Sequence, residues 1–342
     1  MKHTTFAKFI WPSFLAMILF IALPIVSVAV QSLFVEHEQV MREVENCDPF
    51  KCTTTLQVDL DAMAELREEA PLGQFNGLGT YRNRAHLAFA EVSEIWSTTE
   101  TLGDFVRGVY NLPFYKALMF TLTYTGVVTP LVIVFGLFIA LGVNRLPKVT
   151  RGPTIFASLL PMIVTPLIGG LILFWMVDAD GIIGATLQII FDDPNLSLKA
   201  STSLTWIMLM VYGVWHSTPF AFVVFYAGLQ TVPTDTIEAA RIDGASRWQQ
   251  VRYVILPYMM PLLVFITLMQ LMDNFRVLEP IVAFSANSKA TSLSMFIYND
   301  LSGQDKLFGS AAATSMLTIL GVAILLTPVL IRTWRDFNRR SV

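Results

Sequence analysis

Long apolar blocks separated by shorter polar stretches are the main pattern along the chain. A helix needs about 20 apolar residues to cross the hydrocarbon core of a bilayer, and the blocks reach that length. They lack the alternating polarity expected of a membrane β-strand. We therefore expect an all-α, polytopic membrane protein with six spans, at about residues 10–33, 115–143, 153–177, 201–229, 259–284 and 307–331.

The composition supports this prediction. Hydrophobic residues make up 54% of the chain and charged residues 14%, whereas a soluble domain carries roughly 25% charged residues. The net charge of −3 gives no electrostatic support for a nucleic-acid partner. The first apolar block contains Ser27-Val28-Ala29, which resembles a signal-peptide cleavage site. Because the block exceeds the roughly 7 to 15 residues of a signal peptide's apolar region, we expect it to remain as a helix.

The positions of lysine and arginine predict the orientation, because basic residues stay on the cytoplasmic side of the membrane. The short segments on one side hold only Lys199, Lys289 and Lys306. The segments on the other side hold Lys2, Lys8, Arg145, Lys148, Arg151, Arg241, Arg247, Arg252, Arg332, Arg335, Arg339 and Arg340. We therefore expect both termini in the cytoplasm and residues 34–114 outside it.

The first half of this outer segment is acidic and carries the two cysteines of the chain, Cys47 and Cys52. They would lie on the side of the membrane where disulfides survive. A small disulfide-closed loop and two free thiols both remain open, because the spacing fixes no geometry. The four histidines are scattered along the chain, so we expect no metal site.

A polar stretch between the fourth and fifth spans, from Gly228 to Pro257, carries the clearest motif. Asp235 and Glu238 have the spacing of a capping box at a helix start. The alanines that follow keep side-chain bulk low, and Gly244 permits the positive φ that ends one short helix before the next. The stretch therefore predicts a compact helix-turn-helix knob on the cytoplasmic side. A merely amphipathic loop on the lipid surface is the alternative.

The same stretch resembles the EAA loop of binding-protein-dependent ABC importer permeases. Glu238-Ala239-Ala240, Asp243-Gly244-Ala245 and Leu256-Pro257 match the spacing of that loop in the carbohydrate-uptake members. The resemblance extends from residue 75 to the end of the chain and to the first span, and the C-terminus resembles that of the larger, MalF-like subunit. It implies a type I importer permease fold, in which the knob docks in a groove of an ATPase subunit. The coupling residues would be Glu238, Ala239, Ala240, Asp243, Gly244 and Ala245.

The resemblance also implies the rest of the assembly. We expect a second, MalG-like permease, two ATPase subunits, a periplasmic solute-binding protein and a carbohydrate as the transported solute, in a bacterial inner membrane. The chain itself would need no cofactor, with ATP and Mg in the partner ATPase. The expected divisions are the N-terminus and first span (1–33), a periplasmic segment (34–114), a permease core (115–284) with the coupling loop at 230–257, and a final loop, span and tail (285–342).

Ionisable residues inside a span are costly and normally face a partner or a watery cavity. Asp273, Arg276 and Glu279 are spaced by three, which places them on one face of the fifth span if the helix is continuous. Asn274 beside them both donates and accepts hydrogen bonds, as binding of a sugar hydroxyl requires. Solute contact and an intrahelical Asp273–Arg276 ion pair remain equally open. Glu279, near the outer end and before Pro280, fits a gate better than a binding site.

The fourth span is rich in aromatic residues, which can stack against the apolar faces of a sugar. Pro219 removes one backbone hydrogen bond there and predicts a kink. For His216, a hydrogen bond to a neighbouring helix and a ligand contact both remain open. By resemblance to maltose-type permeases, the mid-membrane sugar site would comprise Gly213, His216, Ser217, Phe220, Asp273, Asn274 and Val277. Arg276 joins these candidates as an ionisable residue inside the fifth span.

No sequence signature of catalysis is present. The chain has no phosphate-binding G-x-x-x-x-G-K-[ST] motif, so ATP would be hydrolysed by another chain. Three alternatives stay open: an importer permease for a non-sugar polar solute, an ion-coupled secondary transporter and a membrane-embedded enzyme. ATP-independent uptake would favour the second, and turnover by the isolated chain the third.

Overall fold

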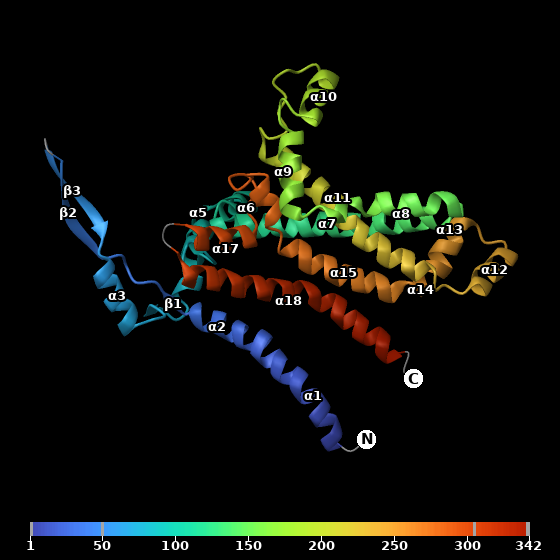
Figure 1. Cartoon of the computed structure of the whole chain (residues 1–342), viewed down its shortest axis with the longest axis horizontal. Coiled ribbons are helices and arrows are strands. Elements are labelled where there is room, and N and C mark those ends of the chain that lie inside the picture. The colour runs from blue at the N-terminus through green and yellow to red at the C-terminus, as the bar shows by residue number, and fades with distance from the viewer. Residues whose placement is uncertain (1–2, 49–50, 304–305, 340–342) are drawn as a thin grey trace. The chain divides into compact units, whose positions relative to one another are not determined.

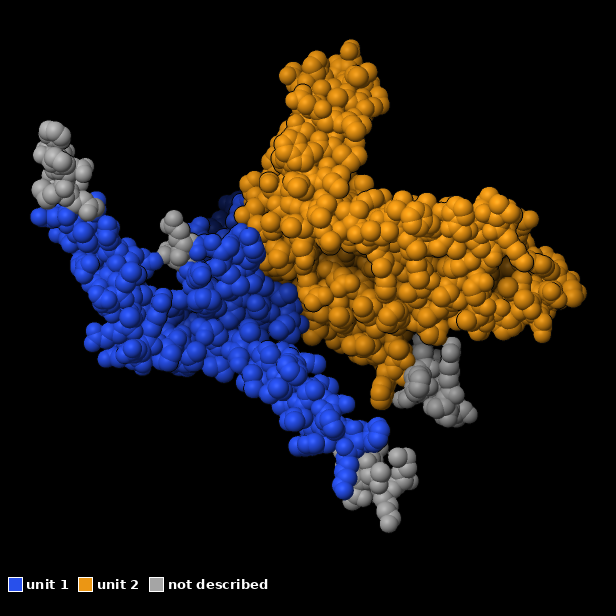
Figure 2. Space-filling model, in the orientation of Figure 1, with its two compact units in different colours: residues 1–115, 296–319 blue, residues 116–295, 320–342 orange. Residues whose placement is uncertain are grey.

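The computed structural model describes residues 3–48, 51–303 and 306–339, and the side chains of 8–45, 54–303 and 306–335. The chain forms two compact units, residues 1–115 with 296–319 and residues 116–295 with 320–342 (Figure 2). Within the described residues, four helices are long and apolar enough to cross a bilayer, or up to six spans if each of two bent helix pairs counts as one. This agrees with the six spans expected from the apolar pattern, although the third and fifth are bent.

The first unit begins with a long helical segment, α1 (His3–Met17), a π-helical turn η1 (Ile18–Ala22) and α2 (Leu23–Gln31) (Figure 1). Every residue of its apolar stretch from 9 to 26 is exposed, as expected of a helix surrounded by lipid or by another subunit. The short strands β1 (Phe34–Val35) and β4 (Gln74–Phe75) then pair in antiparallel fashion.

The insert between these two strands holds a hairpin that the sequence analysis did not predict. Strands β2 (Met41–Asp48) and β3 (Lys51–Val58) pair in antiparallel register, followed by α3 (Leu60–Glu69). The register places Cys47 opposite Cys52. The side chains of both cysteines lie outside the described residues, so the choice between a disulfide and two thiols stays a prediction.

Four further helices belong to this unit: α4 (Gly79–Arg82), α5 (Phe89–Thr98), α6 (Leu102–Tyr110) and α17 (Leu293–Ser302, from Phe296 onward). The start of α18 (Phe308–Arg339) belongs to it as well. His86 is 1% exposed, and its Nε2 lies 3.1 Å from Thr314 Oγ1 and 3.2 Å from the Ser310 carbonyl oxygen. The Glu36 carboxylate accepts a hydrogen bond from the Gly309 amide at 2.6 Å. These contacts tie the beginning of α18 to the outer segment.

The second unit consists of residues 116–295 and 320–342. Its helices are α7 (Pro113–Asn144), the bent pair α8 (Lys148–Ile163) and α9 (Pro166–Met176), the short α10 (Ile182–Phe191) and the long α11 (Thr202–Leu229). After the loop helices come α15 (Met260–Phe275) and α16 (Glu279–Ala283). Phe120, Leu209, Phe222, Phe225 and Ile266 are fully buried between them. Glycines allow close approach: a Cβ at Gly136 of α7 would lie 2.7 Å from the Ala221 Cβ of α11.

Candidate functional site

The stretch expected to form a cytoplasmic knob is helical, with α12 (Thr234–Ile242), α13 (Arg247–Gln250), the π-helical turn η2 (Val251–Ile255) and α14 (Leu256–Tyr258). Gly244 has φ +78°, as its place after α12 requires. The Ala245 amide donates to the Ala240 carbonyl at 2.9 Å, and the Gly244 amide donates to the Arg241 carbonyl at 3.0 Å. This pair of bonds is the Schellman arrangement, which satisfies the last free carbonyls of a helix. The predicted glycine turn is therefore confirmed.

The predicted capping box at Asp235 and Glu238 is wrong. Helix α12 begins after Pro233, which caps without a side-chain hydrogen bond, and Asp235 lies within the first turn. In a capping box, a side chain in the first turn accepts a hydrogen bond from the amide of the N-cap residue. Proline has no amide hydrogen, so this bond cannot form at Pro233, and the fixed φ of proline suits the start of a helix. The capping box of the knob is instead formed by Ser246 and Gln249 at the start of α13.

The knob presents small and charged groups on its surface. Glu238, Ala239, Asp243 and Gly244 are exposed, while Ala240 and Ala245 are half-buried. Ile242 is 86% exposed and Trp248 is 70% exposed, so a large apolar surface stands beside the acidic residues. A surface of this kind is typical of a docking site for another protein. The Tyr258 hydroxyl donates to the Thr231 carbonyl at 2.8 Å and so joins the two ends of the knob.

The fifth span is interrupted twice. Helices Arg247–Tyr258 and Met260–Phe275 meet at an angle of 72°, and α15 then ends at Phe275. The next helix, α16, begins at Glu279. The expectation that Asp273, Arg276 and Glu279 share one helical face is therefore wrong for Glu279. Proline at position 280 can start a helix but cannot donate a hydrogen bond within one, so the chain restarts there.

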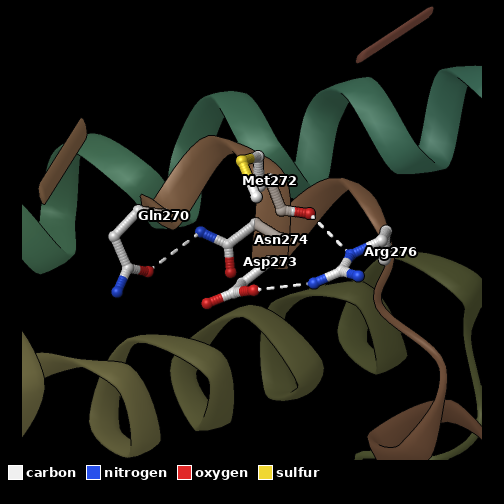
Figure 3. Close-up of polar contacts among 5 residues, drawn as sticks. All are labelled: Gln270, Met272, Asp273, Asn274 and Arg276. Atoms are coloured by element: carbon white, nitrogen blue, oxygen red, sulfur yellow. Dashed lines mark hydrogen bonds and ion pairs between the residues drawn. The ribbon is translucent and has the colours of Figure 1, made fainter. Parts of the chain in front are cut away.

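Asp273 and Arg276 form an ion pair at the end of α15 (Figure 3). Arg276 Nη2 lies 3.0 Å from Asp273 Oδ1, and Arg276 Nε donates to the Met272 carbonyl at 3.3 Å. The arginine thus also caps the C-terminal carbonyls of the helix, where a positive charge is favourable. The two side chains are 56% and 61% exposed, so both charged groups stay available to a ligand.

Asn274 points the other way and is only 5% exposed. Its Nδ2 donates to Thr129 Oγ1 of α7 at 2.9 Å. The same Nδ2 lies 3.4 Å from Gln270 Oε1 (Figure 3). The carbonyl of Val277, which the break leaves without a helical partner, accepts a hydrogen bond from Ser292 Oγ. Val277 itself is 6% exposed. The break is therefore held on its inner side by side chains, while Asp273 and Arg276 face outward.

Sequence reasoning missed Thr129 and Ser292, which fix this break. A signal was available on α7, where Thr121, Thr125 and Thr129 are spaced by four and are all buried. Hydroxyls repeated at this spacing lie on one helix face. Thr121 Oγ1 accepts a hydrogen bond from the Leu293 amide at 3.1 Å, so the threonine face meets both sides of the break.

The predicted residues of the fourth span occupy different environments. Gly213 is buried, and a Cβ there would lie 2.2 Å from the Tyr124 hydroxyl. His216, Ser217 and Phe220 are half-buried. The Phe220 ring lies 6.5 Å from the Phe265 ring of α15, which is eight residues before Asp273. Since a helix rises 1.5 Å per residue, about 12 Å separate these levels along α15.

A cavity of about 720 Å³ lies between α7, α8 and α11. Its lining is almost entirely apolar, with Ser158, Trp215 and Thr218 as the polar contributors. The Thr218 hydroxyl already donates to the Val214 carbonyl at 2.6 Å. Such a lining offers few partners to a polyhydroxylated solute, and none of the eight predicted solute-binding residues contributes to it.

The model of the family of binding-protein-dependent transport system inner membrane components matches residues 105–336. The chain belongs to this family. It is therefore a polytopic membrane permease subunit of the ABC transporter class. The matched range contains the knob, both bent spans and the ion pair of α15, whereas the strand-containing insert lies outside it.

Two curated relatives and one solved structure agree with this assignment. The chain is 29% identical over 226 residues, 66% of its length and 71% of the relative's, to the trehalose transport system permease protein SugA of Mycobacterium tuberculosis. It is 28% identical over 223 residues, 64% of its length and 74% of the relative's, to the trehalose/maltose transport system permease protein MalF of Thermococcus litoralis. A chain of a bacterial ABC transporter that imports alginate superposes with a TM-score of 0.59 at 19% identity, covering 81% of this chain and 93% of that one. This likeness confirms the fold.

Proposed function

We propose that the chain is a channel-forming subunit of an ATP-driven importer for a sugar or sugar derivative. The observation that carries this proposal is the knob, a Schellman-closed pair of short helices with Glu238 and Gly244 exposed, inside the range shared with the family. Trehalose and maltose in the names of the two relatives support a carbohydrate as the solute. The complex would contain a second, MalG-like permease, two ATPase subunits and an extracytoplasmic solute-binding protein.

The knob would transmit the ATPase cycle to the spans. Glu238, Ala239 and Asp243 would face the ATPase, with Ile242 and Trp248 as apolar anchors beside them. Both termini and the knob would be cytoplasmic, and the insert between residues 34 and 74 extracytoplasmic. Because α13, η2 and α14 run directly into α15, a displacement of the knob would reach the ion pair at the opposite end of that helix.

Solute contact would fall mainly to the exposed charges of the fifth span and to the half-buried Ser217 and Phe220 of the fourth. Asp273 and Arg276 provide acceptors and donors for hydroxyl groups, and Phe220 provides a ring face. Ser217 adds a hydroxyl. Gly213, Asn274 and Val277 would shape this region from behind, since their positions are packed against other helices.

The test is ATP-driven uptake of ¹⁴C-trehalose and ¹⁴C-maltose by proteoliposomes that contain the complete complex and its binding protein. We expect uptake that requires ATP and is abolished by Glu238→Ala, with the amount of inserted permease unchanged. The variant Glu100→Ala, a carboxylate in the outer segment, serves as a control and should transport normally. Uptake that is unaffected by Glu238→Ala would refute the coupling role, and uptake without ATP would favour an ion-coupled transporter.

A further inference from the structure

The bend of the third span creates a local problem of hydrogen bonding. Helices α8 and α9 meet at 92°, with Val164 and Thr165 in extended conformation between them. The break follows from Pro166, which disfavours helical backbone at the residue before it. Carbonyl groups near such a break lose their helical partners, and the hydrocarbon core supplies no water to replace them. Irregular backbone at this depth therefore needs partners from the protein itself.

His216 of α11 provides such a partner to the Val164 carbonyl between the helices, and Tyr212 of α11 adds a second bond to the Pro166 carbonyl in the first turn of α9. His216 Nε2 lies 3.0 Å from the Val164 carbonyl oxygen, and the Tyr212 hydroxyl donates to the Pro166 carbonyl at 3.1 Å. A carbonyl oxygen only accepts hydrogen bonds, so His216 must carry its proton on Nε2. The two rings stand one helical turn apart, with their centres separated by 5.7 Å.

The packing around the bend is close enough to hold this arrangement. A Cβ added at Gly169 would lie 2.2 Å from the Tyr212 hydroxyl oxygen, and one added at Gly170 would lie 2.8 Å from the Ala283 Cβ of α16. Glycine at both positions lets α11 and α16 approach the backbone of α9. The Tyr212 side chain is thereby confined to the place where its hydroxyl meets the carbonyl.

We propose that His216 and Tyr212 are positioning residues that fix the bend of the third span, and that His216 does not contact the solute. The transport part of this inference rests on the proposed function. With both bonds formed, α8 and α9 move as one rigid body during the transport cycle. Without them the joint loosens, which slows the cycle but leaves the solute site unchanged.

Hydrogen–deuterium exchange of the purified complex tests the joint without reference to any solute. We expect His216→Leu and Tyr212→Phe to accelerate exchange of amides in residues 163–170 about fivefold, the effect of losing one net hydrogen bond. His216→Gln keeps an N–H donor and should restore slow exchange. Tyr226→Phe makes the same change on α11 at a hydroxyl that has no hydrogen-bond partner within the described residues, and should leave exchange unchanged. Equal exchange in all five proteins would overturn the proposal.

Uptake kinetics with ¹⁴C-trehalose then separate positioning from solute binding. For His216→Leu and Tyr212→Phe we expect the maximal rate to fall about fivefold at unchanged KM, and His216→Gln to recover it. A several-fold rise in KM for both His216 variants, at unchanged exchange, would show that His216 binds solute and would overturn the proposal. If the wild type imports no trehalose, the proposed solute fails, whereas the exchange measurement still decides the joint.

Discussion

Asn274 Nδ2 donates a hydrogen bond to Thr129 Oγ1, 2.9 Å away, and thereby connects the last turn of α15 with the middle of α7. Both side chains are buried. Asp273, which precedes Asn274, and Arg276, two residues after it, are exposed. The contact therefore sets the rotation of α15 about its axis, which determines that the charged pair faces away from the core. A buried polar bond here orients the charged pair that we propose contacts the solute.

This relationship predicts a difference between two identical substitutions on one helix. Thr129→Val removes the acceptor of Asn274 and should lower the melting temperature of the purified protein by about 2 °C, since an interhelical bond in membranes is worth about 1 kcal/mol. Thr125→Val is the matched control. The Thr125 hydroxyl is buried without a hydrogen-bond partner among the described residues, so its replacement by a methyl group should be neutral or stabilising. Equal destabilisation by both variants would contradict the assigned role of Thr129.

For substitutions at Gly244 in the knob, we expect the effect to depend on backbone conformation rather than on the space available for a side chain. Gly244 has φ +78°, and a Cβ there would meet nothing within 4 Å. Gly244→Val should therefore act only through the strain of a left-handed β-branched residue, about 1–2 kcal/mol, and reduce ATPase activity stimulated by the binding protein. Gly244→Asn should retain more of this activity, because asparagine tolerates positive φ. The control Gly142→Ala, in the open helical part of α7, should behave as wild type.

The charged pair of α15 predicts effects on transport without effects on stability. An exposed ion pair is worth about 0–1 kcal/mol, so Asp273→Asn and Arg276→Gln should change the melting temperature little. We expect both to raise the KM for trehalose several-fold. The exchanged variant Asp273→Arg with Arg276→Asp should not recover function, because a carboxylate at position 276 would face the carbonyls that Arg276 now caps. A loss of stability at unchanged KM would assign the pair a structural role.

The close contact between α7 and α11 predicts different effects for two glycine-to-alanine substitutions on α7. Gly136→Ala would place its Cβ 2.7 Å from the Ala221 Cβ and 3.0 Å from the Phe222 backbone nitrogen. Backbone atoms cannot yield cheaply, so we expect a cost of about 1–3 kcal/mol and poor recovery of folded protein. Gly126→Ala on the same helix meets nothing within 4 Å and should be neutral or slightly stabilising. Thermal unfolding in detergent compares the two, and equal stability would contradict the packing.

The outer segment predicts a pH dependence centred on His86. Burial lowers the pKa of His86 below its ordinary value of 6.5, although Ser310 and Asp300 oppose the shift. Below about pH 6.5, His86 therefore binds a proton more readily in the unfolded chain than in the folded chain, and the stability of the fold decreases with acidification. We expect the melting temperature to drop between about pH 7.5 and about pH 5.5, and to drop less in His86→Gln.

Asp300 provides a second test of how stability depends on pH. Burial raises the pKa of Asp300, so its contribution to stability improves as the pH falls, opposite to that of His86. Asp300→Asn removes this compensation and also the charge that supports protonation of His86. The drop in melting temperature between about pH 7.5 and about pH 5.5 should therefore become larger in this variant. A smaller drop would contradict the assignment.

The spans and the knob could be predicted from the sequence because each depends on a local property. Hydrocarbon excludes polar groups, so long apolar blocks have to be spans whatever they pack against. The turn at Gly244 depends on the φ of one residue, which glycine permits and other residues resist. The hairpin in the insert was harder to predict from the sequence, because the alternation of apolar and polar residues in strands β2 and β3 is short. Residues such as Val44 and Thr55 were a weak signal for a hairpin.

Tertiary structure alone settled the details that distinguish exposed from buried positions. Spacing by three predicted one face for Asp273, Arg276 and Glu279, but the helix ends at Phe275 and Glu279 belongs to α16. Likewise, nothing near Asn274 in sequence identifies Thr129, which is 145 positions away, as its partner. A helical repeat specifies faces only while the helix continues, and hydrogen bonds between helices depend on how distant segments pack. Both pieces of information arise only when the chain is folded.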